Sequence, residues 1–395
     1  MATSLTRLSV LLVLLISAAC TTAPEVSPQP PPAPPAEVVA PPVEASLPPE
    51  PPPLPDKSVL RVTIASVGDM MIGTDYPANH LPDDDGVGFL AGVAPVITAA
   101  DIAFGNLEGV LMDGGEPAKK CSNPAACYLF RSPTRYAEHF RAAGFDVLSL
   151  ANNHARDFGE EGRSSSMDAL SRSGIAHSGR EGTMATLTHG DISIAVLAYA
   201  VTRNSNMMLD YPLAFETIAA HAEQHDIVLI SFHGGAEGAD VTHVPFAEEE
   251  YYGEPRGDVV WFARGAVDAG ADLVIGHGPH VVRGMERYKD RLIAYSLGNF
   301  ATYYGISVAG LKGIAPILTV TLDGEGVFVD GQITSTVQLR PGGPVIDPAQ
   351  KALNLMRSLS QEDFGESGLS FLPDGKLLPA ARTAVAVHEG PDNKP

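Results

Sequence analysis

The segment Gly144-Phe-Asp-Val-Leu-Ser-Leu-Ala-Asn-Asn-His154 places two amides and an imidazole directly after a short apolar run. Val147–Leu150 predicts a buried β-strand, and Gly144 fits the end of a preceding helix. Buried amide and imidazole groups are costly unless they are hydrogen-bonded or bound to a ligand. Asn152 fits a cap, which leaves Asn153 and His154 facing a pocket. The pattern predicts a strand whose carboxyl end opens onto a polar site.

Five further polar motifs follow hydrophobic runs in the same way. They are Gly68-Asp69, Asn106-Leu107-Glu108, Ser231-Phe232-His233, Gly276-His277-Gly278-Pro279-His280 and Ser296-Leu297-Gly298-Asn299-Phe300. Because the strand ends of an open α/β sheet share one edge, residues far apart in the sequence can meet there. Asp, Glu, Asn and His are side chains that bind divalent metals. The series therefore predicts a metal-assisted active site.

Alternating strand and helix patterns predict an α/β sheet with helices on its faces. Strands are expected at Val59–Val67, Ile102–Phe104, Val147–Leu150, Ile192–Ala198, Ile227–Phe232, Leu273–Ile275 and Leu292–Ser296. Helical periodicity lies between them, at Val93–Ala99, Pro133–Ala143, Gly162–Ser173, Ala214–Gln224 and Val259–Ala269. Two late strands, Ala315–Leu322 and Val327–Thr336, are expected to form a hairpin, and a last helix follows at about Pro348–Leu359.

Each motif also has a purely structural interpretation. Asp69 fits either a metal ligand or the N-cap of a following helix, and a solvated turn would explain Glu108. A lone strand-end histidine such as His233 is more often a hydrogen-bonded core group, although the adjacent glycines allow close approach of a substrate. His277 and His280, spaced as His-x-x-His around a proline, favour metal binding more strongly.

The first nineteen residues, Met1–Ala19, predict a secretory signal peptide. Their apolar run, Leu8–Ile16, is too short to span a membrane. The small residues before Cys20 resemble a bacterial lipoprotein signal, in which the cysteine is lipidated and becomes the new N-terminus. The alternative is an ordinary cleaved signal with an incidental cysteine. Both interpretations predict an exported protein.

The segment after the signal, residues 20–56, predicts a disordered tether. Nearly half of the residues from Pro24 to Pro55 are proline, which favours extended polyproline II and a semi-rigid spacer. At ~3.1 Å per residue, it could hold the folded part up to roughly 100 Å from a membrane anchor. The folded domain is predicted over residues 57–340, followed by a C-terminal helix and a loose tail in 341–395.

The two remaining cysteines predict a disulfide, and the net charge limits the possible binding partners. Cys121 and Cys127 are close in sequence, and in an exported protein they predict a local disulfide worth roughly 2 kcal/mol. The formal net charge of −21 argues against nucleic acid and against an anionic lipid surface as direct partners. Solubility alone explains this acidity. Arg131, Arg135, Arg283 and Arg287 form either a local basic patch for a polyanion or a solvated face.

The motifs together resemble the poly-γ-glutamate capsule biosynthesis (CapA) family, which is related to the calcineurin-like metallophosphoesterases. The resemblance covers about residues 61–300 and rests on Gly68-Asp69, Asn106-Leu107-Glu108, Gly144–His154, Gly270–His277 with Pro279-His280, and Tyr295–Phe300. It implies an α/β fold, a four-layer αββα sandwich of the metallophosphoesterase type, in which two sheets pack face to face.

The resemblance also implies a metal site. Its ligands would be Asp69, Glu108, Asn153, His233, His277 and His280, holding a divalent cation such as Mn, Fe, Zn or Mg. His154, paired with Asn153, would be the catalytic acid that protonates a leaving group.

Four positions depart from the patterns of the related families. Met71 stands where phosphoesterases have a histidine two residues after the first aspartate, which predicts a weaker or absent second metal position. Gly278, Gly234 and Gly238 replace a histidine and two aromatic residues of the capsule family. These glycines predict a wider and less aromatic pocket mouth.

Two functions fit the sequence best. The first is a metal-dependent hydrolase or transferase that acts on a cell-envelope polymer, such as poly-γ-glutamate, in capsule synthesis or attachment. The second is a non-catalytic protein for polymer binding, export or anchoring that retains the metal site. A structural lipoprotein with a vestigial site is a third. Each places the protein on the periplasmic or cell-surface side, tethered through its N-terminal lipid, with the envelope polymer or the capsule machinery as partner.

Overall fold

The structure, a computed structural model, describes residue 32 and residues 56–119 and 128–380. The folded unit lies within Pro55–Pro395. The predicted signal peptide, Cys20 and the predicted Cys121–Cys127 disulfide lie outside the described residues, as does nearly all of the proline-rich segment. Within the described ranges, no helix combines the length and the apolar character that a membrane span requires.

The first sheet has ten strands and mixes parallel and antiparallel pairs. Its main path runs β20 (Leu369–Phe371), β21 (Lys376–Pro379), β18 (Phe328–Gln338), β17 (Ile314–Asp323), β1 (Arg61–Met71), β2 (Ile102–Leu107), β5 (Val147–Ser149) and β6 (Ala176–Ser178). Off this path, β16 (Asn299–Thr302) pairs with β1, and β19 (Pro344–Ile346) pairs with β18. The β1, β2, β5 and β6 strands are parallel, so their carboxyl ends share one edge.

The second sheet has seven strands and a parallel centre. Its path runs β14 (Met285–Tyr288), β15 (Arg291–Ala294), β13 (Leu273–His277), β10 (Ile227–His233), β8 (Ile192–Ala200) and β7 (Ala185–His189), with β9 (Asn206–Met207) beside β8. Two small two-stranded sheets complete the description: β3 (Val110–Leu111) with β4 (Arg131–Ser132), and β11 (Glu249–Tyr251) with β12 (Glu254–Gly257).

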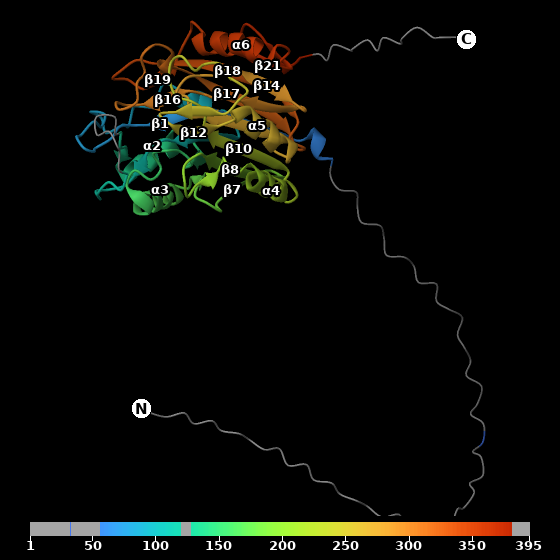
Figure 1. Ribbon diagram of the computed structural model, residues 1–395, viewed down its shortest axis with the longest axis horizontal. Coiled ribbons are helices and arrows are strands. Elements are labelled where there is room, and N and C mark those ends of the chain that lie inside the picture. The colour runs from blue at the N-terminus through green and yellow to red at the C-terminus, as the bar shows by residue number, and fades with distance from the viewer. Residues whose placement is uncertain (1–31, 33–55, 120–127, 381–395) are drawn as a thin grey trace, which may run out of the picture. The chain divides into compact units, whose positions relative to one another are not determined.

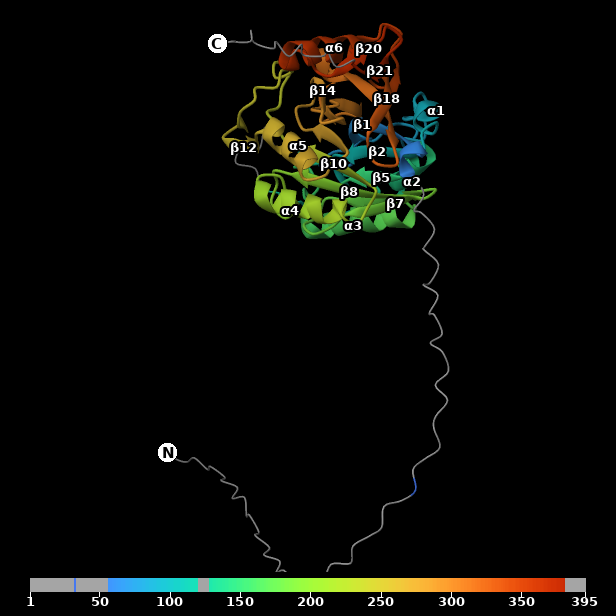
Figure 2. The ribbon, with the colours of Figure 1, turned by 90° about the vertical axis from the view of Figure 1, so that its right-hand side faces the viewer.

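Five of the six described helices form two outer layers, and the sixth, α6 (Lys351–Phe364), packs against the core between the sheets. The other five are α1 (Ala94–Ile97), α2 (Ala137–Ala142), α3 (Gly159–Arg172), α4 (Tyr211–Ala222) and α5 (Val259–Asp268). Residues of α1, α2 and α3 pack on one face of the first sheet, and residues of α4 and α5 pack on one face of the second. Figure 1 shows the layers of the folded unit, and Figure 2 shows α1 and α2 on one side of the sheets and α4 and α5 on the other.

The apolar residues of each strand alternate between two cores. Ile64 and Phe104 of the first sheet share a core with Leu229 and Ile275 of the second, so the two sheets pack face to face. Their neighbour Val228 points instead into the core beneath α4 and α5. This two-residue period is what a strand buried on both faces requires. The result is the predicted four-layer αββα sandwich.

The predicted central strands are present, and several run further than expected. The β1 strand extends through Asp69 to Met71 because Asp69 pairs with Asn299 of β16 and with Asn106 of β2. Asp69 is therefore a strand residue and not a helix N-cap. Gly144 has a positive φ at a helix end, as expected from a C-terminal glycine.

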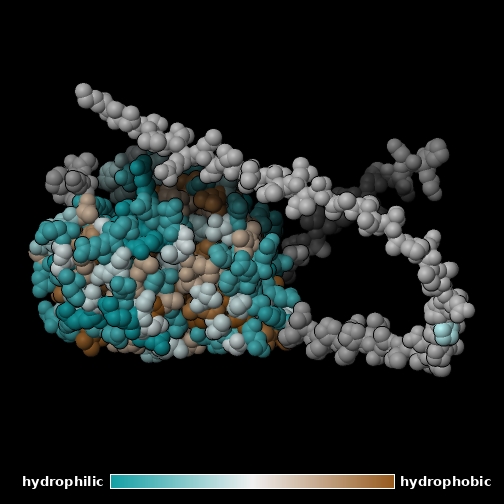
Figure 3. Space-filling view, turned by 90° about the horizontal axis from the view of Figure 1, so that it is seen from below, coloured by the Kyte–Doolittle hydropathy of each residue, from teal (hydrophilic) through white to brown (hydrophobic). Residues whose placement is uncertain are grey.

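The sheet also continues past residue 340. Leu353 and Met356 of α6 pack into the core between the sheets, and β20 and β21 add two edge strands. These strands have only three and four residues, too few for a clear alternation of apolar and polar side chains. One surface of the folded unit, seen from below in Figure 3, is mainly hydrophilic with apolar residues interspersed.

Candidate metal centre

The carboxyl ends of the parallel strands bring the predicted ligands together. Asp69 lies near the end of β1, and Glu108 follows the last residue of β2. His233 and His277 are the final residues of β10 and β13. These strands are parallel neighbours, and the two histidines are register partners. His280 lies three residues further on, in the turn after β13. Four strands from two sheets thus supply one cluster.

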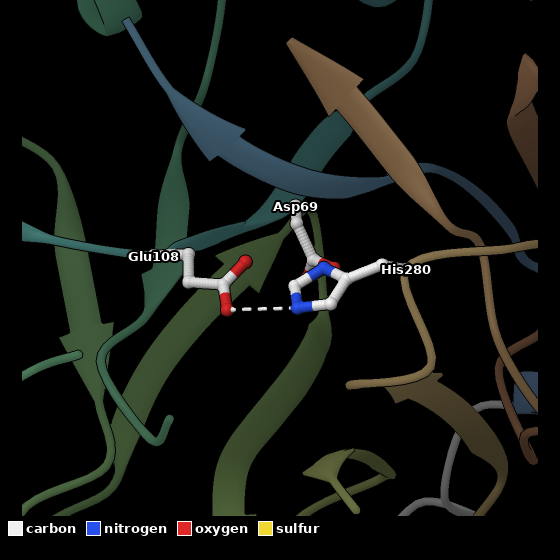
Figure 4. Close-up of side chains that lie close together, drawn as sticks. All are labelled: Asp69, Glu108 and His280. Atoms are coloured by element: carbon white, nitrogen blue, oxygen red, sulfur yellow. Dashed lines mark ion pairs between the residues drawn. The ribbon is translucent and has the colours of Figure 1, made fainter. Parts of the chain in front are cut away.

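Five of the six predicted ligands form this cluster. Asp69 lies 3.3 Å from the Nδ1 atoms of both His277 and His280. Glu108 Oε1 lies 3.6 Å from His280 Nε2 and 3.9 Å from His233 Nε2. Figure 4 shows the side chains of Asp69, Glu108 and His280 pointing toward one another, with the Glu108 carboxylate beside the His280 ring. The ligand atoms of these three residues lie within 4.8 Å of one another, a spacing that could accommodate a metal ion.

The sixth, Asn153, lies on the turn after β5. Its side-chain Oδ1 is buried and accepts no hydrogen bond from any described residue. Its neighbour Asn152 caps this turn, because its Oδ1 accepts the backbone N–H of His154 at 3.0 Å. The Asn152 amide also donates to Asn106 Oδ1 at 3.1 Å, and Asn106 donates to Asp69 Oδ1 at 2.9 Å. This amide chain ties the turn that carries Asn153 to the cluster.

The hydrogen-bonding state of the ligand atoms fits a cation. Among the residues that the structure describes, eight buried atoms on five of the predicted ligands have no hydrogen-bond partner: Asp69 Oδ2, both Glu108 oxygens, Asn153 Oδ1, and both ring nitrogens of His233 and of His277. The short Asp69–imidazole distances therefore lack the orientation of hydrogen bonds. Buried acceptors are normally satisfied, and a divalent cation would satisfy this mixed oxygen and nitrogen set.

Burial opposes the negative charge of both carboxylates in the cluster. Burial raises the pKa of Glu108 to about 8, and the nearby carboxylates of Asp69 and Glu237 add to this effect. For Asp69, burial acts in the same direction, but the imidazoles of His277 and His280 outweigh it and hold its pKa well below the ordinary value. A buried carboxylate pair of this kind is the environment that a bound cation would neutralise.

His154 lies beside the cluster with one ring nitrogen already fixed. Its Nδ1 lies 2.8 Å from Asp157 Oδ2, and the same carboxylate oxygen accepts the backbone N–H of Phe130 at 2.8 Å. The Phe130 ring packs against the imidazole with centroids 4.3 Å apart. Burial lowers the pKa of His154, while the Asp157 carboxylate opposes the shift. The contact leaves His154 Nε2 as the nitrogen available for proton exchange.

Two residues that sequence reasoning did not assign also belong to the site. Asn299 Oδ1 lies 2.8 Å from His280 Nδ1, and Glu237 Oε2 lies 3.7 Å from His280 Nε2. Asn299 stands in one of the strand-end motifs, so its position carried a signal. Glu237 lies on a loop whose course depends on a buried ion pair with Arg256, 3.1 Å away, which no local pattern reveals.

The glycines at two departures from the family pattern do not widen the pocket. A Cβ on Gly278, whose φ is +115°, would lie 2.6 Å from the Gly234 carbonyl oxygen and 3.2 Å from Arg256 Nη2. A Cβ on Gly234 would lie 2.7 Å from the Met208 sulfur. Backbone, Arg256 and Met208 therefore fill the space, and the expectation of a wider mouth is wrong at these two positions.

The basic patch considered from sequence is not a free surface either. Arg283 is fully buried and makes two hydrogen bonds to Glu249, at 2.8 and 2.6 Å. Arg131 pairs with Asp75 at 2.7 Å. Counter-charges already hold these cations.

The chain was compared with known proteins. A family model described as bacterial capsule synthesis protein PGA_cap matches residues 63–304. Capsule biosynthesis protein CapA of Bacillus anthracis is 25% identical over 272 residues, which cover 61% of this chain and 59% of that protein. PGA biosynthesis protein CapA of Bacillus subtilis (strain 168) is 27% identical over 253 residues, covering 59% of this chain and 61% of that protein. The chain thus spans less than two thirds of the length of either relative.

Among solved structures, a purple acid phosphatase from yellow lupin (Lupinus luteus) seeds gives a TM-score of 0.37 at 9% identity, covering 73% of this chain and 54% of that one. The family match is the decisive comparison, because it takes in more than half of the chain and every residue of the buried cluster. The chain belongs to the family of bacterial capsule synthesis proteins described as PGA_cap.

Proposed function

We propose that this protein is a metal-dependent hydrolase or transferase that acts on a cell-envelope polymer, with poly-γ-glutamate as the first candidate. The convergence of buried ligand atoms without hydrogen-bond partners carries this proposal. The names of the two Bacillus relatives, which refer to capsule and PGA biosynthesis, support the choice of polymer. The proposal includes export and an N-terminal lipid on Cys20, for which the small residues before Cys20 are the support.

The ligand set would hold the cation between the two sheets. Its members would be Asp69, Glu108, Asn153, His233, His277 and His280. When bound, a divalent cation supplies Lewis-acid polarisation of a carbonyl or phosphoryl oxygen and lowers the pKa of water. Asn299 would fix the ring of His280, since a hydrogen bond to the second nitrogen of a ligating histidine sets its orientation.

His154 would move the proton. Because Asp157 holds the Nδ1 atom of His154, the Nε2 atom would donate the proton to the leaving group. Arg256, buried beside Glu237, adds a fixed positive charge to the wall of the site. A developing negative charge on the substrate would be stabilised by such a preorganised group.

Metal analysis of the full chain, purified without chelator or affinity-tag histidines, tests this function. Elemental analysis should find metal in the wild type and little in His233→Ala and His277→Ala. His189→Ala is the matched control, since this histidine lies on an edge strand and its side chain is 39% exposed. Metal in all four proteins, or in none after loading with manganese, iron or zinc, would contradict the proposed centre. Substrate screening with phosphodiesters and γ-glutamyl oligomers then tests turnover.

A further inference from the structure

A cavity lies apart from the candidate metal centre and shares none of its residues. It has a volume of about 560 Å³, is open to solvent on one side and is lined by residues of α6, the β14–β15 turn, β20 and the segment that leads into it. Figure 2 shows α6 and β20 together at one end of the molecule. Six residues that line it carry the argument: Arg287, Lys289, Arg357, Gln361, Ser367 and Phe371.

The strand register separates this cavity from the metal centre. The β13 strand carries His277 at its carboxyl end, and β15 runs parallel to it, with Leu292 paired to Leu273. Arg287 lies on β14 opposite Leu292, at the amino ends of these parallel strands. The cavity therefore opens at the opposite edge of the second sheet and belongs to a different site.

The positive charges in the cavity are unevenly compensated. Arg287 pairs with Asp290 at 2.7 Å, and Lys289 pairs with Asp268 at 2.6 Å. Arg357 has only neutral partners: it donates to the Leu372 carbonyl at 3.1 Å and to Asn354 Oδ1 at 3.4 Å. It forms no ion pair with any carboxylate of the described residues.

Two guanidinium donors in the cavity wall lack acceptors. The Nε atoms of Arg287 and Arg357 are both buried, and neither donates a hydrogen bond to a described residue. Buried donors of charged groups are normally satisfied, because leaving them unpaired is unfavourable. Two such donors beside one cavity are available to an acceptor from outside the protein.

The chemistry of the wall defines the ligand. A guanidinium presents planar N–H donors that match the oxygens of a carboxylate or phosphate. Gln361 and Ser367 add neutral polar groups, and Phe371 adds an apolar side. Asp290 and Glu366 also line the cavity, and their carboxylates would repel a ligand that carries several negative charges. We propose that this cavity is an oxyanion-binding site that takes a single phosphate or carboxylate group on Arg287 and Arg357.

Such a site matters because the chain as a whole repels anions. With a net charge of −21, an acidic polymer is held only where cations are locally uncompensated. The proposal rests on the cavity and its arginines alone, so its test is independent of any catalysis at the metal centre.

Calorimetric titration of the full chain with inorganic phosphate, and separately with glutarate, tests the site at constant ionic strength. Arg357→Gln should weaken binding by at least about tenfold, because it removes the charge and the donor fork. Gln361→Glu, on an exposed position of α6, should weaken it similarly by adding a negative charge. Arg172→Gln, on an exposed arginine at the end of α3, should bind as the wild type does.

The two probes distinguish the source of the oxyanion. If Arg357→Gln weakens the binding of phosphate alone, the natural ligand carries a phosphate group. If it weakens the binding of glutarate alone, the ligand carries a carboxylate. If it weakens both, the guanidinium recognises the oxyanion geometry that the two groups share. Phosphate held at the metal centre would bind equally to every variant. If Arg357→Gln and Gln361→Glu both bind as the wild type does, or if neither probe binds at millimolar concentration, the proposal is overturned. Circular dichroism of each variant confirms folding.

Discussion

His154 Nδ1 lies 2.8 Å from Asp157 Oδ2, and both groups are buried. The contact spans only three residues of the turn between β5 and α3, yet Lys119 and the Phe130 backbone N–H also bind the same carboxylate, at 3.2 and 2.8 Å. The Asp157 side chain therefore has little freedom, and it holds the Nδ1 atom of His154 in place.

Replacing Asp157 with Asn should reduce turnover by on the order of 10²-fold, because His154 loses the group that holds its tautomer and orientation. Metal content should stay at the wild-type level, since Asp157 touches none of the predicted ligands. The measurement is kcat on whichever substrate the screen identifies, with elemental analysis alongside. A variant that lost metal as well as turnover would point to a collapsed turn and not to a positioning role.

Asn299→Ala should weaken metal affinity by roughly 10- to 100-fold, because the hydrogen bond that orients His280 is lost. Competition with a metal-binding dye measures the affinity. The matched control is Asn79→Ala, an exposed asparagine that only caps its own turn. Equal affinities in the two variants would show that His280 is held by its neighbours and not by Asn299.

Removing metal should lower stability. A cation that binds only the folded chain adds about 2.7 kcal/mol to the free energy of unfolding when its concentration is 100 times its Kd. Urea unfolding with and without a chelator measures this difference. The same treatment should leave His277→Ala almost unchanged, and an equal response in the variant would place the stabilising metal elsewhere.

Gly68→Ala should destabilise the fold by about 2–3 kcal/mol, because overpacking at a rigid site forces the backbone to shift. A Cβ on Gly68 would lie 1.9 Å from the Gly298 carbonyl oxygen, which also accepts the Asp69 N–H at 2.8 Å. Gly342→Ala is the control, since its nearest neighbour atom would be 3.3 Å away. Chemical denaturation distinguishes them, and equal midpoints would mean that β1 and β16 can move apart without cost.

Asp272 predicts a pH dependence of stability. Burial raises its pKa to about 6 from an ordinary 3.8, although Arg291, 2.8 Å away, opposes the shift. Since the folded state binds this proton more tightly, the contribution is greatest below the unfolded pKa and is lost as the pH rises to about 6. The free energy of unfolding should fall by about 3 kcal/mol across this window in the wild type, relative to Asp272→Asn. Parallel curves for the two proteins would show that the Arg291 ion pair offsets burial.

The central part of the fold was predictable because each strand is short, apolar and followed by polar residues. Sequence reasoning placed Ile227–Phe232 within one residue of β10, which ends at His233. It ended the first strand at Val67, although β1 runs to Met71, because the pairing with β16 comes from a segment distant in sequence. Long-range pairing of this kind leaves no local pattern.

In the candidate site, too, some residues could be predicted from local sequence and others could not. Asp69 and His277 were predicted to converge from their positions at strand ends, and they lie 3.3 Å apart. Glu237 was not assigned, because its approach to His280 depends on a loop held by Arg256 from a different sheet. Strand ends are fixed by the topology, whereas loop courses are fixed by side chains that meet only in the folded protein.

The order of the ligands along the chain has a consequence for biogenesis. A chain that emerges from its N-terminus first presents Asp69 and Glu108 early, but His277 and His280 appear only after most of the folded part has been made. Before the second sheet docks, the early carboxylates have no imidazole partners and offer a divalent ion only weak, exposed oxygen ligands. Cation capture at the proposed centre would therefore be one of the last events in maturation, and the compartment where the chain completes its folding would decide which metal it acquires.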